Sequence, residues 1–542
     1  MHHMNINYFM LFLILSTFSL TAQNQNFTHQ DTLRGSITPE RSWWDLTYYH
    51  LDITIDPENK SIRGTNTIYY KVLERNNVLQ VDLQSPLVIE KVVEDGVELK
   101  VRTDGNAHFV TLQKNQKKDC INKIEVYYKG IPREAVNAPW DGGISWKKDI
   151  NGNHFIASSC QGLGASAWWP NKDHMYDEVD SMLVSVTVPK GLINVSNGRL
   201  RKIEPHESTK TYHWFISNPI NNYGVNINIG DYVHFGEQYE GEKGTLDMDY
   251  YVLKDNLEQA KEQFKDAPRM MQAFEHWFGP YPFYEDSFKL VEVPYLGMEH
   301  QSSVTYGNKY VNGYLGNDLS DTGWGLKFDF IIIHESGHEW FANSITNKDI
   351  ADMWIHESFT AYSECLFLDY HYGKEAASEY IVGTRRNIQN DVPIIGAYNV
   401  NSEGSFDMYY KGANMLHTLR QLIDDDAKWR LILRGMNKEF YHQTVTTQQI
   451  ETYLATKTGL NLIAFFNQYL RSVKIPILEY NFSNEGLRYR YTDIVEGFDM
   501  PVRIYIDKKD QWIQPNADWQ TLQIKADSIT IDPNFFVIAR SI

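Results

Sequence analysis

The spacing of apolar residues changes twice along this 542-residue chain, and the order of these changes limits the folds open to it. From about residue 48 to 235, apolar and polar residues alternate, as in HLDITI and TNTIYYKV. This alternation is typical of half-buried strands. From about residue 257 to 470 the spacing becomes helical, and extended patterns return from about residue 475. We therefore predict a multidomain α+β protein, because the chain is too long for one core.

The same order predicts the domain boundaries. We expect an N-terminal antiparallel β domain at residues 23–238 and a mainly helical domain at residues 239–474. A small C-terminal β domain, similar to a β-sandwich, is expected at residues 475–542.

The first 22 residues have most features of a secretory signal peptide. Apolar residues run from Tyr8 to Leu20, and small residues follow up to Ala22, where we expect cleavage. No Lys or Arg precedes this run, which departs from the usual pattern. An uncleaved anchor is the alternative, but the run is short for a membrane span of about 20 residues. We expect a secreted or periplasmic protein without stable membrane insertion after cleavage.

Charge and cysteine content argue against a nucleic-acid-binding protein and against a fold that depends on several disulfides. The chain has 51 basic and 69 acidic residues, a net charge of −18, and no basic cluster, which disfavours a nucleic-acid partner. Cys120, Cys160 and Cys365 allow at most one disulfide and form no Cys-x-x-Cys pair. Stability must therefore come from packing.

The segment HESGHEW, residues 334–340, has the spacing of a zinc site. On a helix, His334 and His338 project from one face about one turn apart, and Glu335 lies beside the metal as a general base. A catalytic zinc ion needs a third protein ligand. Glu357 follows His338 after eighteen residues and is the candidate, although most glutamates are solvated surface residues. The sequence predicts one Zn²⁺ per chain, held by His334, His338 and Glu357.

Four separated segments resemble the M1 family of zinc aminopeptidases. HESGHEWFANSIT with WIHESFTAY matches the zinc-binding block of the family, and YLGMEHQ matches its Gly-x-Met-Glu-Asn signature. MYYKGANML and CQGLGASAWWPNKD are similar to two further family segments. The resemblance spans nearly the whole chain after residue 22. It implies a thermolysin-like, mainly helical catalytic domain and the activity of a metalloaminopeptidase.

The resemblance also implies how the substrate is held. Glu299 corresponds to the glutamate that binds the free α-ammonium group, with Gly297 and Met298 beside it in the signature. Gln161 corresponds to a second ligand of this amine, and a side chain at a strand edge is the alternative. The expected partners are peptides with a free N-terminus.

The remaining catalytic role implied by the resemblance belongs to a tyrosine. Tyr409, two residues before Lys411, corresponds to the donor of a hydrogen bond to the oxyanion, and Tyr410 is its rival. We thus expect hydrolysis of the N-terminal peptide bond by metal-activated water, with Glu335 as general base and Tyr409 stabilising the oxyanion. Glu364, seven residues after Glu357, is a candidate for orienting a ligand histidine.

Two departures from the family pattern are expected to matter. His300 replaces the family asparagine after Glu299, which affects the hydrogen bonding of that loop. Fewer than a hundred residues follow the helical region, so we expect a short form without the large helical C-terminal domain, and a more open site. An endopeptidase that shares only the zinc core and a non-catalytic peptide-binding relative remain alternatives. The sequence makes no prediction of oligomeric state.

Overall fold

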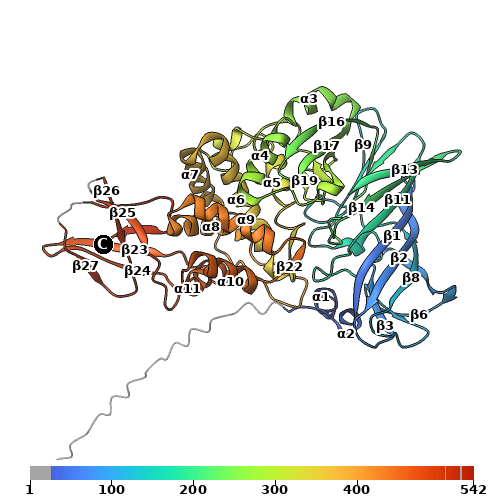
Figure 1. Cartoon of the computed structure of the whole chain (residues 1–542), viewed down its shortest axis with the longest axis horizontal. Helices are drawn as coiled ribbons and strands as arrows, with labels where there is room; N and C mark the ends of the chain where they lie inside the picture. Colours follow the sequence, from blue (N-terminus) through green and yellow to red (C-terminus); the bar gives the residue numbers. More distant parts are fainter. Residues whose placement is uncertain (1–25, 507, 525–527) are drawn as a thin grey trace, which may run out of the picture.

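The computed structural model describes residues 26–506, 508–524 and 528–542. A β-rich region lies at one end, helices fill the middle, and a small β region forms the other end (Figure 1). The predicted signal peptide lies outside the described residues. Among the described residues, none of the helices combines the length and the apolar character that a membrane crossing requires.

The N-terminal region is built around an eight-stranded sheet whose buried residues follow the predicted alternation: Leu51, Ile53 and Ile55 are buried and face the core. In spatial order its strands are β13 (Arg199–Pro205), β14 (Thr209–Ile216), β11 (Met182–Pro189), β1 (Trp44–Asp56), β2 (Ser61–Val72), β8 (Ile121–Gly130), β4 (Val88–Glu94) and β5 (Val97–Glu98).

The prediction of a purely antiparallel sheet is wrong at one pair. Strands β1 and β11 run parallel, whereas the other neighbours in this sheet are antiparallel. Alternation of apolar residues is the same for both directions, so the sequence pattern carried no information on this pair.

Two smaller sheets and an N-terminal arm complete this region. One sheet contains β12 (Ile193–Val195), β15 (Asn228–Gly230), β10 (His154–Ser159) and β9 (Gly143–Lys148), and the other contains β3 (Val78–Asp82), β7 (Ala107–Thr111) and β6 (Lys100–Asp104). The arm, residues 26–43, carries α1 (His29–Gly35) and α2 (Pro39–Ser42).

The middle region combines helices with a five-stranded sheet. Its strands, in order, are β16 (Tyr232–Gly241), β17 (Gly244–Leu253), β18 (Phe288–Glu292), β20 (Val304–Tyr306) and β19 (Gly297–Met298). The boundary predicted between residues 238 and 239 falls within β16. Strands β21 (Ile345–Asn347) and β22 (Gln443–Val445) form a separate parallel pair.

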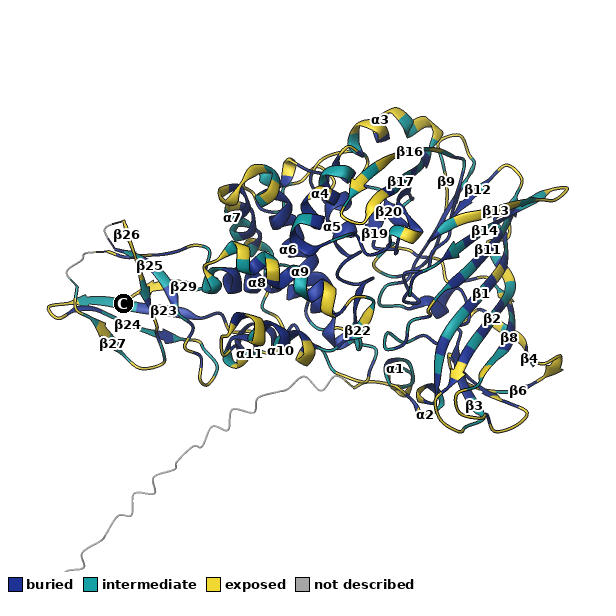
Figure 2. Ribbon diagram, in the orientation of Figure 1, coloured by how far each residue is buried: buried dark blue, intermediate teal, exposed yellow. Residues whose placement is uncertain are grey.

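Helices of the middle region enclose the predicted zinc-binding segment, and α5 and α6 lie at its buried centre (Figure 2). The helices are α3 (Leu257–Gln263), α4 (Asp266–Phe278), α5 (Phe330–Gly337), α6 (Trp354–Tyr372), α7 (Lys374–Gly383), α8 (Tyr410–Ile423), α9 (Asp426–Glu439), α10 (Thr447–Thr458) and α11 (Ile463–Leu470).

The C-terminal region consists of two small sheets whose apolar residues join the core of the helical region. Tyr469 donates a hydrogen bond from its hydroxyl to the carbonyl of Phe536 at 2.8 Å, which links α11 to this region. One sheet contains β27 (Gln520–Leu522), β24 (Gly486–Thr492), β23 (Ile477–Ser483) and β29 (Ile538–Ser541), and the other contains β26 (Lys509–Ile513), β25 (Val502–Ile506) and β28 (Thr530–Ile531).

Candidate active site

The segment with the two predicted zinc-ligand histidines is a buried helix, although Ile331 to Ile333 would also suit a strand. Asp329 caps α5: its side chain accepts hydrogen bonds from the backbone N–H groups of Ile331 and Ile332 at 3.1 and 3.3 Å. All eight residues of α5 are buried, so tertiary packing outweighs the strand preference of the isoleucines. His334 lies on α5, and His338 is the residue at its C-terminal cap.

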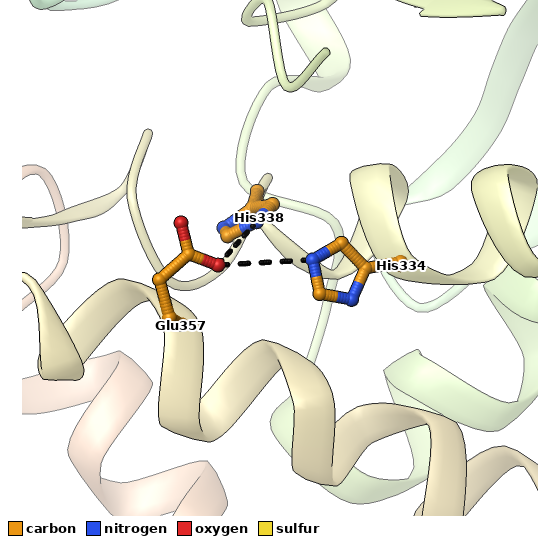
Figure 3. Close-up of side chains that lie close together, drawn as sticks. All are labelled: His334, His338 and Glu357. Atoms are coloured by element: carbon orange, nitrogen blue, oxygen red, sulfur yellow. Dashed lines mark ion pairs between the residues drawn. The ribbon is translucent and has the colours of Figure 1, made fainter. Parts of the chain in front are cut away.

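The three predicted metal ligands converge on one point (Figure 3). Glu357, in the first turn of α6, places its Oε2 atom 3.7 Å from Nε2 of His334 and 3.4 Å from Nε2 of His338. Ligands at the usual zinc bond lengths of ~2.0–2.2 Å lie about 3.3 Å apart in a tetrahedral site. The observed spacing fits this geometry.

An unpaired oxygen supports the same assignment. Oε2 of Glu357 is buried and has no hydrogen-bond partner among the described residues. A buried carboxylate oxygen without a partner is unfavourable unless a cation neutralises it. Two imidazoles and one carboxylate are a donor set that zinc prefers. The residues present therefore fit a zinc ion.

Outer contacts orient both histidines toward the metal position. Nδ1 of His334 lies 2.7 Å from Oε1 of Glu364. The other carboxylate oxygen of Glu364, Oε2, accepts a hydrogen bond from the hydroxyl of Tyr380. Nδ1 of His338 lies 3.0 Å from the carbonyl oxygen of Phe341. Partners of this kind fix the ring and leave Nε2 free for the metal. The contact predicted for Glu364 is present.

Negative charge accumulates around the metal position. Burial disfavours the charged form of His334, but the carboxylates of Glu357 and Glu364 outweigh this effect and raise its pKa. Burial, together with the nearby carboxylate of Glu299, raises the pKa of Glu335 to about 7. A site with this surplus of buried carboxylates favours a bound cation.

Gln161 and Glu299 meet beside the metal ligands. Gln161 lies in the loop after β10, and its Nε2 donates hydrogen bonds to Oε1 of Glu299 at 2.5 Å and to Oε1 of Glu357 at 3.1 Å. Carboxylate oxygens of Glu299 and Glu335 also lie within 4.8 Å of an imidazole nitrogen of His338. An ammonium group bound here would lie next to the metal.

The Gly-Met pair before Glu299 supports this arrangement through its backbone. A Cβ atom on Gly297 would lie 2.5 Å from Cγ2 of Ile331, so only glycine permits the close approach of β19 to α5. The side chain of Met298 is 2% exposed and packs in the core of the N-terminal region. Both residues line the cavity, and their predicted contact with substrate remains a prediction.

Tyr409, rather than Tyr410, faces the site. Tyr409 precedes α8, and its ring centroid lies 5.9 Å from that of His334. The described residues that line the cavity include Tyr409 and not Tyr410. The geometry therefore favours the tyrosine chosen from the Tyr-x-Lys-Gly spacing.

His300 directly follows Glu299 and is fully buried. Its Nδ1 lies 3.2 Å from Oγ1 of Thr305, and its Nε2 has no partner within the described part of the chain. Burial lowers the pKa of His300 to about 3, so the ring is neutral near pH 7. The substitution therefore adds no charge beside the amine position.

A cavity of about 480 Å³ contains all nine predicted site residues. The sequence did not predict the residues at the rim of the cavity, which include Trp140 and Phe406 with exposed fractions of 64% and 60%. A tryptophan inside the turn-like segment NAPWDGG was the available signal, because a large apolar residue is uncommon in an exposed turn. Other rim residues that were missed are Arg133, Pro139, Asp141, Asn401, Ser402 and Glu403.

Comparison with known proteins agrees with this geometry. Residues 262–469 match the model of the peptidase family M1 domain. Leukotriene A-4 hydrolase of Xenopus laevis is 23% identical over 446 residues, which cover 77% of this chain and 68% of that protein. Aminopeptidase N of Lactobacillus helveticus is 23% identical over 530 residues, covering 89% of this chain and 56% of that protein.

The fold has solved counterparts. An M1 zinc metallopeptidase mutant from Deinococcus radiodurans, bound to a Tyr-Ser-Ala substrate, superposes with a TM-score of 0.67 at 19% identity. The match covers 82% of this chain and 98% of that one. Residues 262–469 are therefore similar to a peptidase family M1 domain, the fold is that of an M1 zinc metallopeptidase, and His334, His338 and Glu357 form a possible metal site within this segment.

Proposed function

We propose that this protein is an aminopeptidase that removes the first residue of peptides with a free N-terminus. The observation that carries the proposal is the contact of Gln161 with both Glu299 and the metal ligand Glu357. An ammonium group held by Glu299 would lie one residue's length from the metal, which directs hydrolysis to the first peptide bond. An internal segment of a peptide lacks this charge.

Each catalytic residue has one task in this reaction. Zinc, when bound, acidifies a water molecule and polarises the carbonyl group of the substrate. Glu335 accepts the proton of the attacking water and delivers it to the leaving amine. The hydroxyl of Tyr409 donates a hydrogen bond to the carbonyl oxygen as negative charge develops there. Glu299 and Gln161 hold the substrate so that its first carbonyl faces these groups.

A paired-substrate assay tests the proposal. A chromogenic aminoacyl substrate panel and a short peptide are compared with the N-acetylated form of the same peptide, with and without a chelator. We expect rapid, chelator-sensitive release of the first residue and at least a hundredfold slower cleavage of the acetylated peptide, because that peptide lacks the charge that binds Glu299. Equal rates for the two peptides would indicate an endopeptidase.

A zinc-loaded protein that cleaves none of these substrates would instead be a peptide-binding relative without activity. Zinc analysis of the same sample separates this outcome from loss of the metal. A general aminopeptidase panel also identifies the preferred first residue.

We also propose that the protein is exported and that residues 1–22 are removed. The supporting observation is the apolar run that ends in small residues before Gln23. N-terminal sequencing of the mature protein tests this proposal, and an N-terminus at Gln23 is the expected result.

A further inference from the structure

The N-terminal arm contacts two loops of the active-site cavity that are far from it in the sequence. Helix α1 lies between the N-terminal sheets and the helical region (Figure 1). Residues 161–163 form the first loop and carry Gln161, and residues 401–403 form the second. None of the described arm residues, 26–43, lines the cavity, so the arm can act on the site only through these two loops.

Arg34 binds the first loop directly. Its Nη1 donates hydrogen bonds to the carbonyl of Leu163 at 2.9 Å and to Oδ2 of Asp173 at 2.7 Å. Asp173 in turn accepts a hydrogen bond from the backbone N–H of Ser166 at 2.9 Å. A Cβ atom on Gly164 would lie 1.9 Å from Nη2 of Arg34, so the guanidinium packs against the backbone of the loop.

The loop depends on such contacts because its own backbone is permissive. Gly162 and Gly164 have φ angles of 66° and 94°, a region that glycine adopts freely. Besides a tight turn, the loop is held by two side chains that donate to the carbonyl of Leu163, those of Arg34 and Gln84. Leu163 is two residues from Gln161. A displacement of its carbonyl would therefore move the amide that contacts Glu299.

The arm also joins the second loop to the first. The backbone N–H of Asn401 donates to the carbonyl of Asp31 at 3.1 Å, and its side chain donates to the carbonyl of Gly162 at 3.3 Å. Gly35 lies against Val400 so closely that a Cβ atom would be 2.1 Å from the carbonyl carbon. Three segments that are remote in sequence thus meet at α1.

We propose that Arg34 is a positioning residue for recognition of the substrate amine. By holding the carbonyl of Leu163, Arg34 fixes the Gln161 amide against Glu299 and Glu357. This inference rests on the proposed aminopeptidase function. The arm would then contribute to substrate binding through residues 161–163. It would take no part in the chemical step.

Kinetics of single and double variants test the proposal. We expect Arg34→Ala to raise KM for a free aminoacyl substrate about tenfold, the size expected for one hydrogen bond to a charged group, with a smaller change in kcat. Arg34→Lys keeps the charge but not the forked geometry, and should be intermediate. In a Gln161→Ala background, Arg34→Ala should change KM less than twofold, because both changes remove the same interaction.

A matched inhibitor pair distinguishes positioning from general loosening of the site. Arg34→Ala should weaken an aminoacyl hydroxamate about tenfold and leave acetohydroxamate, which lacks the amine, unchanged. His29→Ala is the control, since His29 lies on the same helix, is exposed, and pairs with Asp104, which does not line the cavity. It should change neither inhibitor.

Several results would overturn the proposal. These are an unchanged KM in folded, zinc-loaded Arg34→Ala, equal weakening of both inhibitors, or additive effects with Gln161→Ala. If Arg34→Ala does not fold, Arg34→Lys and Arg34→Gln provide the same comparison. Failure of the proposed function is distinguishable, because the unchanged protein would then release no N-terminal residue.

Discussion

The candidate metal ligands and the residues proposed to bind the substrate amine differ in how far apart they lie in the sequence. The ligands and their orienting partner Glu364 come from two successive helices, α5 and α6, within residues 334–364. Gln161 is 138 residues from Glu299, and Arg34 is 129 residues from Leu163. The candidate metal ligands are therefore close together in the sequence, whereas the proposed recognition of the amine depends on contacts between distant parts of the chain.

Loss of a metal ligand should reduce activity more than any other change. This loss should occur even though the contacts of the N-terminal region with the site are intact. We expect His338→Ala to lose both bound zinc and all measurable activity, because a single change removes one of three protein ligands. Metal analysis and an aminoacyl substrate assay measure this. Chelated wild-type protein should recover activity when zinc is added back, and full activity without zinc would contradict the metal site.

Removal of the general base should separate catalysis from metal binding. Glu335→Gln keeps the shape of the side chain and should retain zinc, but kcat should fall by about 10²–10⁴-fold because no group accepts the proton. The measurement is kcat with zinc content determined on the same sample. Near-normal turnover in this variant would show that another residue acts as the base.

The tyrosine pair offers a matched test with a smaller effect. Tyr409→Phe should lower kcat by about 10²-fold with little change in KM, since the phenol donates only as charge develops. Tyr410→Phe is the control and should be near wild type, because Tyr410 does not line the cavity formed by the described residues. A larger loss in the Tyr410 variant would reverse the assignment.

The smallest expected effect belongs to the N-terminal region and has a different kinetic signature. Gln161→Ala should raise KM for free-amine substrates about tenfold while kcat changes less, because an amine-binding contact is lost. Steady-state kinetics with a substrate panel measure both constants. If kcat falls as strongly as in Tyr409→Phe, Gln161 contributes to the chemical step and not only to binding of the amine.

Site residues that are close together in the sequence could be predicted from their spacing. Helical spacing predicted that His334 and His338 project from one face. Glu357 was predicted from the eighteen residues that separate it from His338, and the structure brings the three together. Asp329, which caps α5 and resolves the ambiguity of the isoleucine run, was equally local but was missed. Residues chosen by resemblance, including Tyr409 and Gln161, lie at the cavity, while their proposed roles remain predictions.

The features that were missed depend on tertiary contacts. Trp140 and Arg133 reach the cavity from the connection between β8 and β9. Arg34, on the arm, contacts the loop that carries Gln161. The parallel pairing of β1 with β11 joins segments more than a hundred residues apart. Each position is set by packing between remote elements, and a single sequence carries no spacing rule for such contacts.

The shared core of the last two regions has a consequence for anyone who wants a minimal catalytic fragment. Helix α8 starts immediately after Tyr409, and farther along it His417 and Thr418 bind Asn534 and the backbone of Phe536. Trimming the chain to residues 262–469 would remove these hydrogen bonds from α8, while its packing against α6, α7 and α9 would remain. A minimal fragment should therefore keep the connection between β28 and β29, because Asn534 and Phe536 in it bind the helix that follows Tyr409.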